Sequence, residues 1–270
     1  EDGIRDYKVT GVQTCALPIS DQFPSNFYAW RTLAAERHAT MCAVPWPDDE
    51  DWTRAVIDAI DGCTGIVAIP NCHWSNGTRL DLEQVSARCR EVSAHLVLDL
   101  SQSLGVLPCD VRKVDPDFLV TASYKWLLGP YSLCYLYVAP RWHGGRPLEQ
   151  NPLSRSNAVA RPEWKHGETP YPETFLPAAR RYDVGERANF ALLPMSIAAL
   201  RQLHDWRPAR IAEYLHPLIE HAVVRARDLG ITVPPAAARS PHMIGMRLPP
   251  DMDLNALGQM LERRRIHVSV

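Results

Sequence analysis

The order of apolar and polar positions along the chain follows two periods. Apolar residues recur at helical spacing over 28–38, 49–60, 82–94, 190–204, 207–229 and 254–265. Compact apolar runs rich in β-branched residues predict strands over 40–44, 64–69, 95–100, 117–122 and 133–138. Strands that alternate with helices are typical of βαβ crossovers. The pattern therefore predicts an α/β fold whose mostly parallel sheet carries helices on both faces.

Two later stretches depart from this alternation. Residues 141–179 are rich in Pro, Gly, His and charge, and they indicate a long excursion of the kind that is usually functional or disordered. The last part of the chain predicts short strands around one helix, over 231–233, 243–248 and 266–270. We therefore expect a major domain over 20–205 and part of a small α+β C-terminal domain over 206–270, truncated within its last strand.

The first 19 residues have neither a clear periodicity nor the cationic start and apolar core of a signal peptide. They resemble the translation of a sequencing adapter, and such segments are set aside when a fold is predicted. We expect 1–19 to be a non-native segment outside the fold. The natural protein is then expected to begin before Ser20, with a major domain truncated at its N-terminal side.

Composition narrows the class of protein. The 270 residues are 46% hydrophobic and 22% charged, which is ordinary globular composition. A formal net charge of −2 without a basic cluster argues against a nucleic-acid partner, and no apolar run reaches the roughly 18 residues of a membrane span. Seven cysteines without a CxxC pair indicate buried thiols in a reducing cytoplasm, not a disulfide or zinc framework, so no metal site is predicted.

Reactive residue types follow three of the predicted strands, where ligands gather in parallel sheets. They are His73 and Trp74 after 64–69, Asp99 and Gln102 at the end of 95–100, and Ser123, Tyr124 and Lys125 after 117–122. A carboxylate and an amine at two strand ends suit a cofactor with an aldehyde and a pyridine ring. The lysine forms an imine with the aldehyde, and the carboxylate keeps the ring nitrogen protonated.

The stretch HLVLDLSQSLGVLPCDVRKVDPDFLVTASYKWLLGPYSLCYLYVAP, residues 95–140, resembles the cofactor-binding half of the class V aminotransferases. It is most similar to the branch of the isopenicillin epimerases and kynureninases. Further similar stretches are FPSN at 23–26, HWSNG at 73–77 and RRYDVGERANF at 180–190. The resemblance covers nearly all of 21–270, and its most specific parts are D-x-x-Q followed by SYKWLLGP.

This resemblance implies a pyridoxal-phosphate-dependent enzyme of fold type I that acts on a small amino-acid substrate. Lys125 would hold the cofactor as a Schiff base and then move the Cα proton as general base and acid. Asp99 would pair with the pyridinium, and Gln102 would hydrogen-bond the phenolic oxygen of the ring.

The resemblance also assigns the remaining cofactor contacts. Tyr124 and Ser123 would reach the phosphate, and Phe23 would stack on the pyridine face. The family's phosphate-binding loop and its carboxylate-binding arginine are both expected outside this chain, so the chain could by itself be inactive.

Substrate contacts are implied for His73 and Trp74, for which plain packing is an equal alternative. Asn189 would line the pocket. The resemblance also implies a homodimer, in which Asn189 would line the pocket of the partner subunit. A neighbouring set of charges, Asp183, Glu186 and Arg187, is read first as a structural ion-pair cluster.

Other functions stay open at this stage. Transamination, epimerisation and side-chain cleavage share one fold, which cannot choose among them. A desulfurase would need a mobile nucleophilic cysteine in a late loop. It is disfavoured because the last cysteine here, Cys134, lies within a predicted strand, unless that cysteine was lost with the C-terminus. A nucleotide-dependent oxidoreductase would need a GxGxxG turn, which is lacking. A non-catalytic binding or assembly protein would have no need to keep both Lys125 and Asp99.

Overall fold

The computed structural model describes residues 15–156, 171 and 173–268. Its centre is a six-stranded sheet in the order β2-β1-β3-β4-β5-β6. The strands are β1 (Cys15–Leu17), β2 (Thr40–Met41), β3 (Thr64–Pro70), β4 (His95–Asp99), β5 (Phe118–Ala122) and β6 (Cys134–Val138). All pairs are parallel except β5 and β6, which are antiparallel. The predicted α/β class with a mostly parallel sheet is therefore confirmed.

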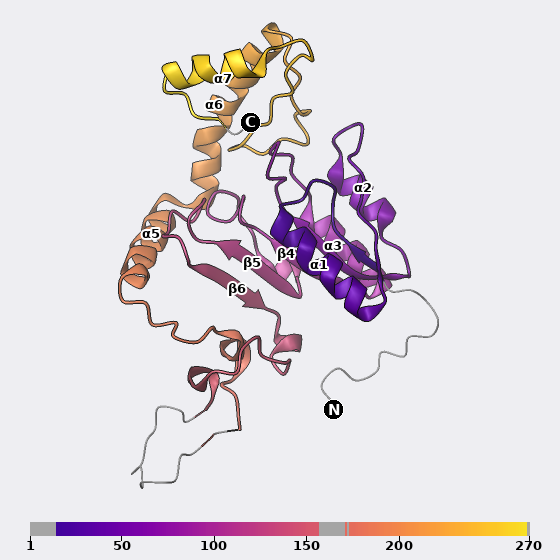
Figure 1. The fold of residues 1–270 in the computed structure, drawn as a ribbon, viewed down its shortest axis with the longest axis vertical. Coiled ribbons are helices and arrows are strands. Elements are labelled where there is room, and N and C mark those ends of the chain that lie inside the picture. The colour runs from indigo at the N-terminus through magenta and orange to yellow at the C-terminus, as the bar shows by residue number, and fades with distance from the viewer. Residues whose placement is uncertain (1–14, 157–170, 172, 269–270) are drawn as a thin grey trace.

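The longer helices correspond closely to the predicted ones. They are α1 (Pro24–Arg37), α2 (Trp52–Ala59), α3 (Leu82–Val92), α5 (Leu192–Trp206), α6 (Pro208–Asp228) and α7 (Leu254–Arg263), with the short α4 (Val111–Val114) between β4 and β5. The first three lie beside the β1–β4 half of the sheet, whereas α6 rises from α5 into a separate lobe with α7 (Figure 1). Three 3-10 turns, η1 (Pro140–Trp142), η2 (Pro152–Ser154) and η3 (Ala178–Tyr182), lie between β6 and α5.

The core forms where α2 and α3 pack against the sheet. Trp52 and Val56 project from one face of α2 and are fully buried, and Val85 of α3 meets them in the same cluster. Each of these helices begins at an aspartate whose carboxylate accepts backbone N–H groups of the first turn, Asp51 for α2 and Asp81 for α3. Caps and apolar spacing thus agree, which explains why both helices could be predicted.

Residues 15–17 are an exception to our expectation, because they form β1 inside the sheet. Leu17 is 1% exposed, and Ile19 forms a bridge with Val44 and belongs to the core. Setting aside all of 1–19 as lying outside the fold was therefore wrong for 15–19. The short apolar run CALPI supplies side chains that fill the gap between β2 and β3. The adapter origin of residues 1–19 stays a prediction. Residues 1–14 lie outside the described residues.

The prediction of strands near the C-terminus was also wrong. Thr232 and Arg247 form one isolated bridge where 231–233 and 243–248 were expected to be strands, and 266–268 has no regular structure. A two-stranded pair without a sheet to join is only marginally stable, so the local β pattern does not decide the outcome here. Residues 269–270 and 157–170 of the long excursion lie outside the described residues, and the boundary near residue 205 stays a prediction.

The cysteines and helices bear on two further predictions. All seven thiols are free, and Cys15, Cys72 and Cys89 are buried as expected, but Cys42, Cys63 and Cys134 are exposed. None of the described helices has the length and apolar character that a membrane crossing requires.

A buried carboxylate fastens the start of β5 to its surroundings. Asp117 accepts hydrogen bonds from the Leu96 amide at 2.8 Å, from Arg141 Nε at 2.7 Å and from Trp142 Nε1 at 2.6 Å. Burial alone would raise the pKa of Asp117, but the hydrogen bonds from His95, Arg141, Trp142 and Leu96 together lower that pKa well below its ordinary value. The charged carboxylate therefore stabilises the fold.

Asp117→Asn is expected to lower the free energy of unfolding by about 2–3 kcal/mol at pH 7, because it removes the charge of a buried carboxylate that accepts hydrogen bonds from Leu96, Arg141 and Trp142. The pKa of Asp117 is lower in the folded than in the unfolded protein, so its contribution is fully present above about pH 4 and is lost as the pH falls below that. The difference in unfolding free energy between the two proteins should therefore narrow in acid.

The control for this prediction is Asp115→Asn. Asp115 pairs with the same Arg141 guanidinium at 2.8 Å, but both side chains of this pair are more than two-fifths exposed. Denaturant unfolding should show a loss below about 1 kcal/mol for this variant. Equal losses of unfolding free energy at the two positions would show that burial of the Asp117 carboxylate is not the source of its stabilising effect.

Candidate active site

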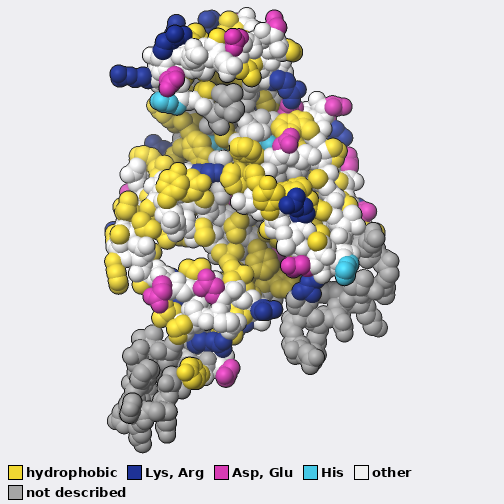
Figure 2. All heavy atoms as spheres, viewed as in Figure 1, with side chains coloured by type: hydrophobic (Ala, Val, Ile, Leu, Met, Phe, Trp, Pro, Cys, Tyr) yellow, Lys and Arg dark blue, Asp and Glu magenta, His cyan; other side chains and the backbone are white. Residues whose placement is uncertain are grey.

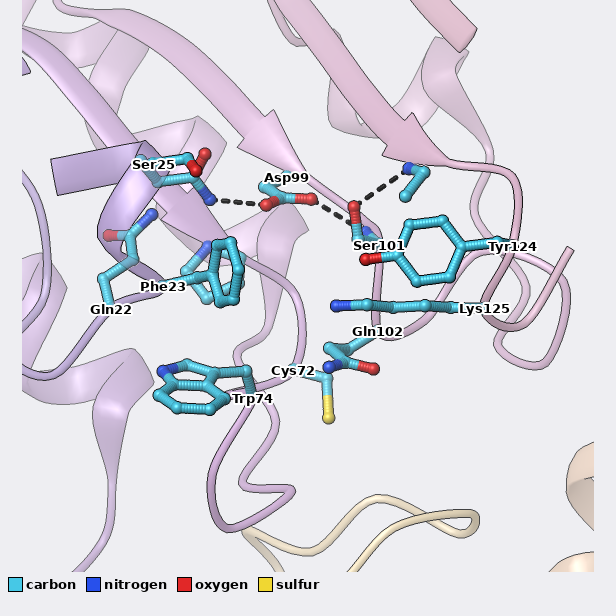
Figure 3. Close-up of a pocket in the computed structure, with 13 residues that line it drawn as sticks. Gln22, Phe23, Ser25, Cys72, Trp74, Asp99, Ser101, Gln102, Tyr124 and Lys125 are labelled. Carbon is cyan, nitrogen blue, oxygen red and sulfur yellow. Dashed lines mark hydrogen bonds between the residues drawn. The ribbon is translucent and has the colours of Figure 1, made fainter. Parts of the chain in front are cut away.

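One pocket of about 190 Å³ opens at the carboxyl ends of the central strands. Its walls come from four segments: Pro70, Cys72 and Trp74 after β3; Asp99, Ser101 and Gln102 after β4; Ala122, Tyr124 and Lys125 after β5; and Gln22, Phe23, Ser25 and Asn26 at the start of α1 (Figure 3). The strand register places Asp99 beside Pro70 on one side and Val120 on the other. Parallel pairing thus brings the three predicted strand ends together.

Asp99 is held in a fixed orientation at the centre of this pocket. One carboxylate oxygen accepts the Ser101 amide at 2.9 Å, and the other accepts the side-chain amide of Asn26 (Figure 3). Asn26 was not among the predicted site residues. The FPSN motif contained it, but an asparagine in a first helical turn gives no sign of the distant carboxylate that it will meet after folding.

Lys125 reaches into the pocket from the loop after β5. Its Nζ lies 5.3 Å from the centroid of the Phe23 ring and 5.9 Å from that of Tyr124. Lys125 forms no ion pair within the described part of the chain. Its charged amine instead makes cation–π contacts with these two rings. The loop itself is a closed turn, in which the Leu128 amide donates to the Lys125 carbonyl at 3.0 Å.

A glycine lets the loop after β4 approach the lysine loop. Gly105 has φ +104°, and a Cβ there would lie 2.2 Å from the carbonyl oxygen of Trp126, which follows Lys125. Only a residue without a side chain fits this conformation and this distance. The position of Lys125 therefore depends on a backbone contact that no strand or helix pattern indicates.

The aromatic residues divide between pocket and core. Phe23 and Trp74 meet edge to face at 5.7 Å, and each is about two-fifths exposed on the pocket wall. His73 is fully buried, stacks on Trp52 at 5.5 Å and shares a hydrogen bond with Ser75 Oγ at 2.9 Å. Burial lowers the pKa of His73, which favours the neutral ring. Of the two interpretations of His73, substrate contact and plain packing, this position fits packing, because the loop after β3 turns its ring into the core.

The two residues expected to reach the phosphate, Tyr124 and Ser123, lie in different environments. Tyr124 lines the pocket and stacks on Tyr131 with ring centroids 4.1 Å apart. Ser123 is fully buried and its hydroxyl donates to the Pro130 carbonyl, so this side chain is engaged in closing its own turn. Gln102 lines the pocket as expected, but the cofactor roles of all three stay predictions.

Asn189 lies apart from the pocket of its own chain. Its side-chain oxygen accepts the amides of Ala191 at 3.2 Å and Leu192 at 2.9 Å, so it caps the start of α5. Nearby, Arg187 and Asp183 form an ion pair at 3.5 Å, as the structural interpretation of that cluster predicted. A contact of Asn189 with the pocket of a partner subunit stays a prediction.

This sheet, with an amine and a carboxylate at neighbouring strand ends, is the arrangement of the fold type I pyridoxal-phosphate-dependent enzymes. A family model described as Aminotransferase class-V matches residues 13–270. The chain therefore belongs to the class V aminotransferase family.

Curated relatives lie in the same family. The chain is 25% identical to an uncharacterized aminotransferase, YcbU, of Bacillus subtilis over 239 residues, covering 83% of this chain and 61% of YcbU. It is 24% identical to a kynureninase of Bacillus cereus over 242 residues, covering 84% of this chain and 54% of that enzyme. The chain thus spans between half and two thirds of the length of these relatives.

Solved structures confirm the fold. The apo cysteine desulfurase of Thermococcus onnurineus NA1 superposes with a TM-score of 0.77 at 15% identity, covering 95% of this chain and 62% of that chain. A C-DES mutant with glycine linked covalently to its PLP cofactor superposes with a TM-score of 0.75 at 18% identity, covering 95% and 67%. At these identities the likeness establishes the fold and not the reaction.

Proposed function

We propose that this protein is a pyridoxal-phosphate-dependent enzyme that acts on an amino acid and holds its cofactor through Lys125. The observation that supports this most strongly is the joint placement of Lys125 and Asp99 on one pocket beside the Phe23 ring. The pocket residues fit the cofactor, because they offer an amine for its aldehyde, a fixed carboxylate for its ring nitrogen and an aromatic side chain for its ring face.

Each side chain then has a definite task. When bound, pyridoxal phosphate supplies an aldehyde carbon that bonds to amines and a pyridine ring that accepts electrons from the substrate. Lys125 would hold the cofactor through this aldehyde, and its amine, when free, would take a proton from Cα of the substrate or return one. Asp99, oriented by Asn26 and by the Ser101 amide, would keep a proton on the ring nitrogen.

The reaction that follows is transamination, epimerisation or side-chain cleavage. Cys72, the one cysteine on the described pocket wall, does not suit the nucleophilic role of a desulfurase cysteine. Its thiol is 1% exposed, and burial raises the pKa of Cys72 to about 11. A nucleophilic cysteine needs a lowered pKa and access to substrate, and Cys72 has neither.

An absorbance spectrum of the purified chain titrated with pyridoxal phosphate tests the proposal. We expect a yellow band that differs from that of the free cofactor and that borohydride bleaches, leaving the cofactor attached to protein. A spectrum equal to the sum of free cofactor and protein, with nothing attached after borohydride, would rule the proposal out for this chain.

We further propose that the protein works as a homodimer in which the segment around Asn189 approaches the partner's pocket. Hydrophobic side chains gather on the face over β5, β6 and α5 (Figure 2). Phe190 is 89% exposed next to Asn189, and Met195 of α5 is 56% exposed. Apolar side chains this exposed in one region are typical of an interface, and a two-fold pairing lets one surface serve both sites.

Phe190→Asp is expected to shift the protein from dimer to monomer, by at least about ten-fold in the dissociation constant, because it buries a charge in place of an aromatic anchor. Light scattering over a dilution series measures this. Tyr214→Asp on α6, where the ring is 72% exposed, is the matched control and should leave the dimer intact. A wild-type chain that stays monomeric at all concentrations would contradict the dimer.

A further inference from the structure

A segment from the C-terminal part of the chain, residues 238–245, lies against the loop after β3. The Ser240 amide donates to the Gly77 carbonyl at 3.0 Å, and the Gly245 amide donates to the Asn76 carbonyl at 2.7 Å. These bonds join residues more than 160 positions apart in the chain, and the loop that they hold carries Cys72 and Trp74 of the pocket wall.

The two backbones approach so closely that glycine is required on both sides. Gly77 has φ +73°, and a Cβ there would lie 2.2 Å from the Met243 carbonyl oxygen. A Cβ on Gly245 would lie 2.5 Å from Asn76 Cα. The contact is therefore a fitted one between main chains and not a loose approach of surface loops.

His242 stands at the centre of this segment and reaches the other two loops of the pocket. It is 7% exposed, and its Nε2 lies 2.6 Å from the Gln102 carbonyl oxygen. A carbonyl can only accept, so Nε2 carries the hydrogen. The imidazole also meets the Trp126 indole edge to face, with centroids 4.5 Å apart, and Trp126 follows Lys125 in the chain.

The ring is held as a neutral single donor. Its Nδ1 is buried and has no hydrogen-bond partner among the described residues. Burial lowers the pKa of His242 to about 4, which the bond to Gln102 only partly opposes. An unpartnered acceptor in a buried position costs free energy, and the contacts that offset this cost for His242 are those of Nε2 and of the ring face.

We propose that His242 is a positioning residue of the cofactor site. Its Nε2–H fixes the main chain at Gln102, and its ring fixes Trp126, so that docking of residues 238–245 sets both the loop that carries Gln102 and the loop that carries Lys125. The cofactor role of these loops rests on the proposed function; the coupling of the three segments does not.

Two substitutions separate the two contacts of His242. His242→Phe keeps a ring against Trp126 and removes the donor, whereas His242→Gln restores an amide donor where Nε2 lies and removes the ring. The matched control is His143→Phe, since His143 also bonds a backbone carbonyl through Nε2, that of Val138 at 3.1 Å, but away from the pocket.

Hydrogen exchange of the cofactor-free chain is the first measurement. The Ser103 and Leu104 amides both donate to the Leu100 carbonyl, at 2.9 and 2.8 Å, in the loop that His242 holds. His242→Phe is expected to speed their exchange by about five- to ten-fold, the effect of one lost hydrogen bond. His242→Gln and His143→Phe should stay within about two-fold of the wild-type rates. Unchanged rates in the Phe variant, or equal effects of Phe and Gln, would overturn the proposal.

Pyridoxal phosphate affinity is the second measurement, by spectral titration of the same proteins. His242→Phe should weaken binding by about ten-fold, and the Gln variant should recover most of that loss. Failure of the wild-type chain to bind pyridoxal phosphate would count against the proposed function alone, because hydrogen exchange still decides whether His242 holds the loop. If the wild-type chain binds pyridoxal phosphate and His242→Phe binds it with the same affinity, the positioning role of His242 is contradicted.

A measurement on the wild-type protein covers the case in which His242→Phe does not fold. Nitrogen-15 chemical shifts of labelled histidine report the tautomer directly. We expect His242 to be neutral at pH 7 with its proton on Nε2, and that proton to exchange slowly with water. A proton on Nδ1, or a charged ring, would show that the bond to Gln102 is not made as proposed.

Discussion

Lys125→Ala is expected to abolish the attachment of pyridoxal phosphate to the protein by borohydride. The amine of Lys125 lies 5.3 Å from the Phe23 ring in the pocket that Asp99 also lines, and alanine leaves no nitrogen there to bond the aldehyde. Mass spectrometry of the reduced protein should show complete loss of the added cofactor mass. The fold should survive, because the side chain contributes a cation–π contact worth about 0.5–1 kcal/mol.

The matched control is Lys113→Ala. Lys113 lies exposed on α4, outside the pocket lining, and its replacement should leave attachment unchanged. Thermal unfolding of both variants checks that the fold is retained. Peptide mapping that places the reduced cofactor on Lys113 or Lys165 in the wild-type protein would show that Lys125 is not the cofactor lysine.

Much of this site could be predicted from the sequence because it depends on strand ends. Asp99 and Lys125 each follow a compact apolar run, and parallel pairing brings the carboxyl ends of such runs to one edge of the sheet. A residue's place at a strand end is a local property of the chain. The pocket could therefore be assigned from residues 95–125 without knowledge of how the rest of the protein folds.

The contacts that orient those residues could not be predicted, because each joins segments far apart in the sequence. Asn26 meets Asp99 across 73 positions, and His242 meets Gln102 across 140. Gly105 is required by a close approach to Trp126 that has no periodic signature. These residues are polar or small and lie in loops or, for Asn26, in the first turn of α1, where local patterns say little about what a side chain will touch.

The two aromatic residues after β3 could not be told apart for a related reason. His73 follows β3 as directly as Trp74 does, but the loop turns one ring into the core beside Trp52 and the other onto the pocket. Alternation along a strand does not continue through a loop, so two adjacent aromatic residues cannot be assigned to two environments from their order. The strand β1 was missed for a different reason: residues 1–19 were set aside for their resemblance to a translated adapter, so the apolar run at 15–17 was not considered as a strand.

Asp99→Asn is expected to leave cofactor attachment intact and to remove most of the catalytic rate. Asparagine keeps the shape of the side chain and its contact with the Ser101 amide, but it carries no charge to hold a proton on the ring nitrogen. Loss of that proton weakens the electron sink by about 4 kcal/mol, which is about 10³-fold in rate. The matched control is Asp110→Asn, an aspartate on the surface that pairs with Arg112 and should leave the rate unchanged.

Deuterium uptake at Cα of a bound amino acid measures this effect without assuming the final reaction. Transamination, epimerisation and Cα-initiated side-chain cleavage all begin by moving that proton, and Lys125 is the proposed base in each case. The nitrogen-15 shift of labelled pyridoxal phosphate adds a readout that needs no turnover: it should report a protonated ring nitrogen in the wild type and a neutral one in Asp99→Asn. A protonated nitrogen in the variant, or deuterium uptake within about ten-fold of wild type, would mean that Asp99 serves the fold of the strand end and not the cofactor.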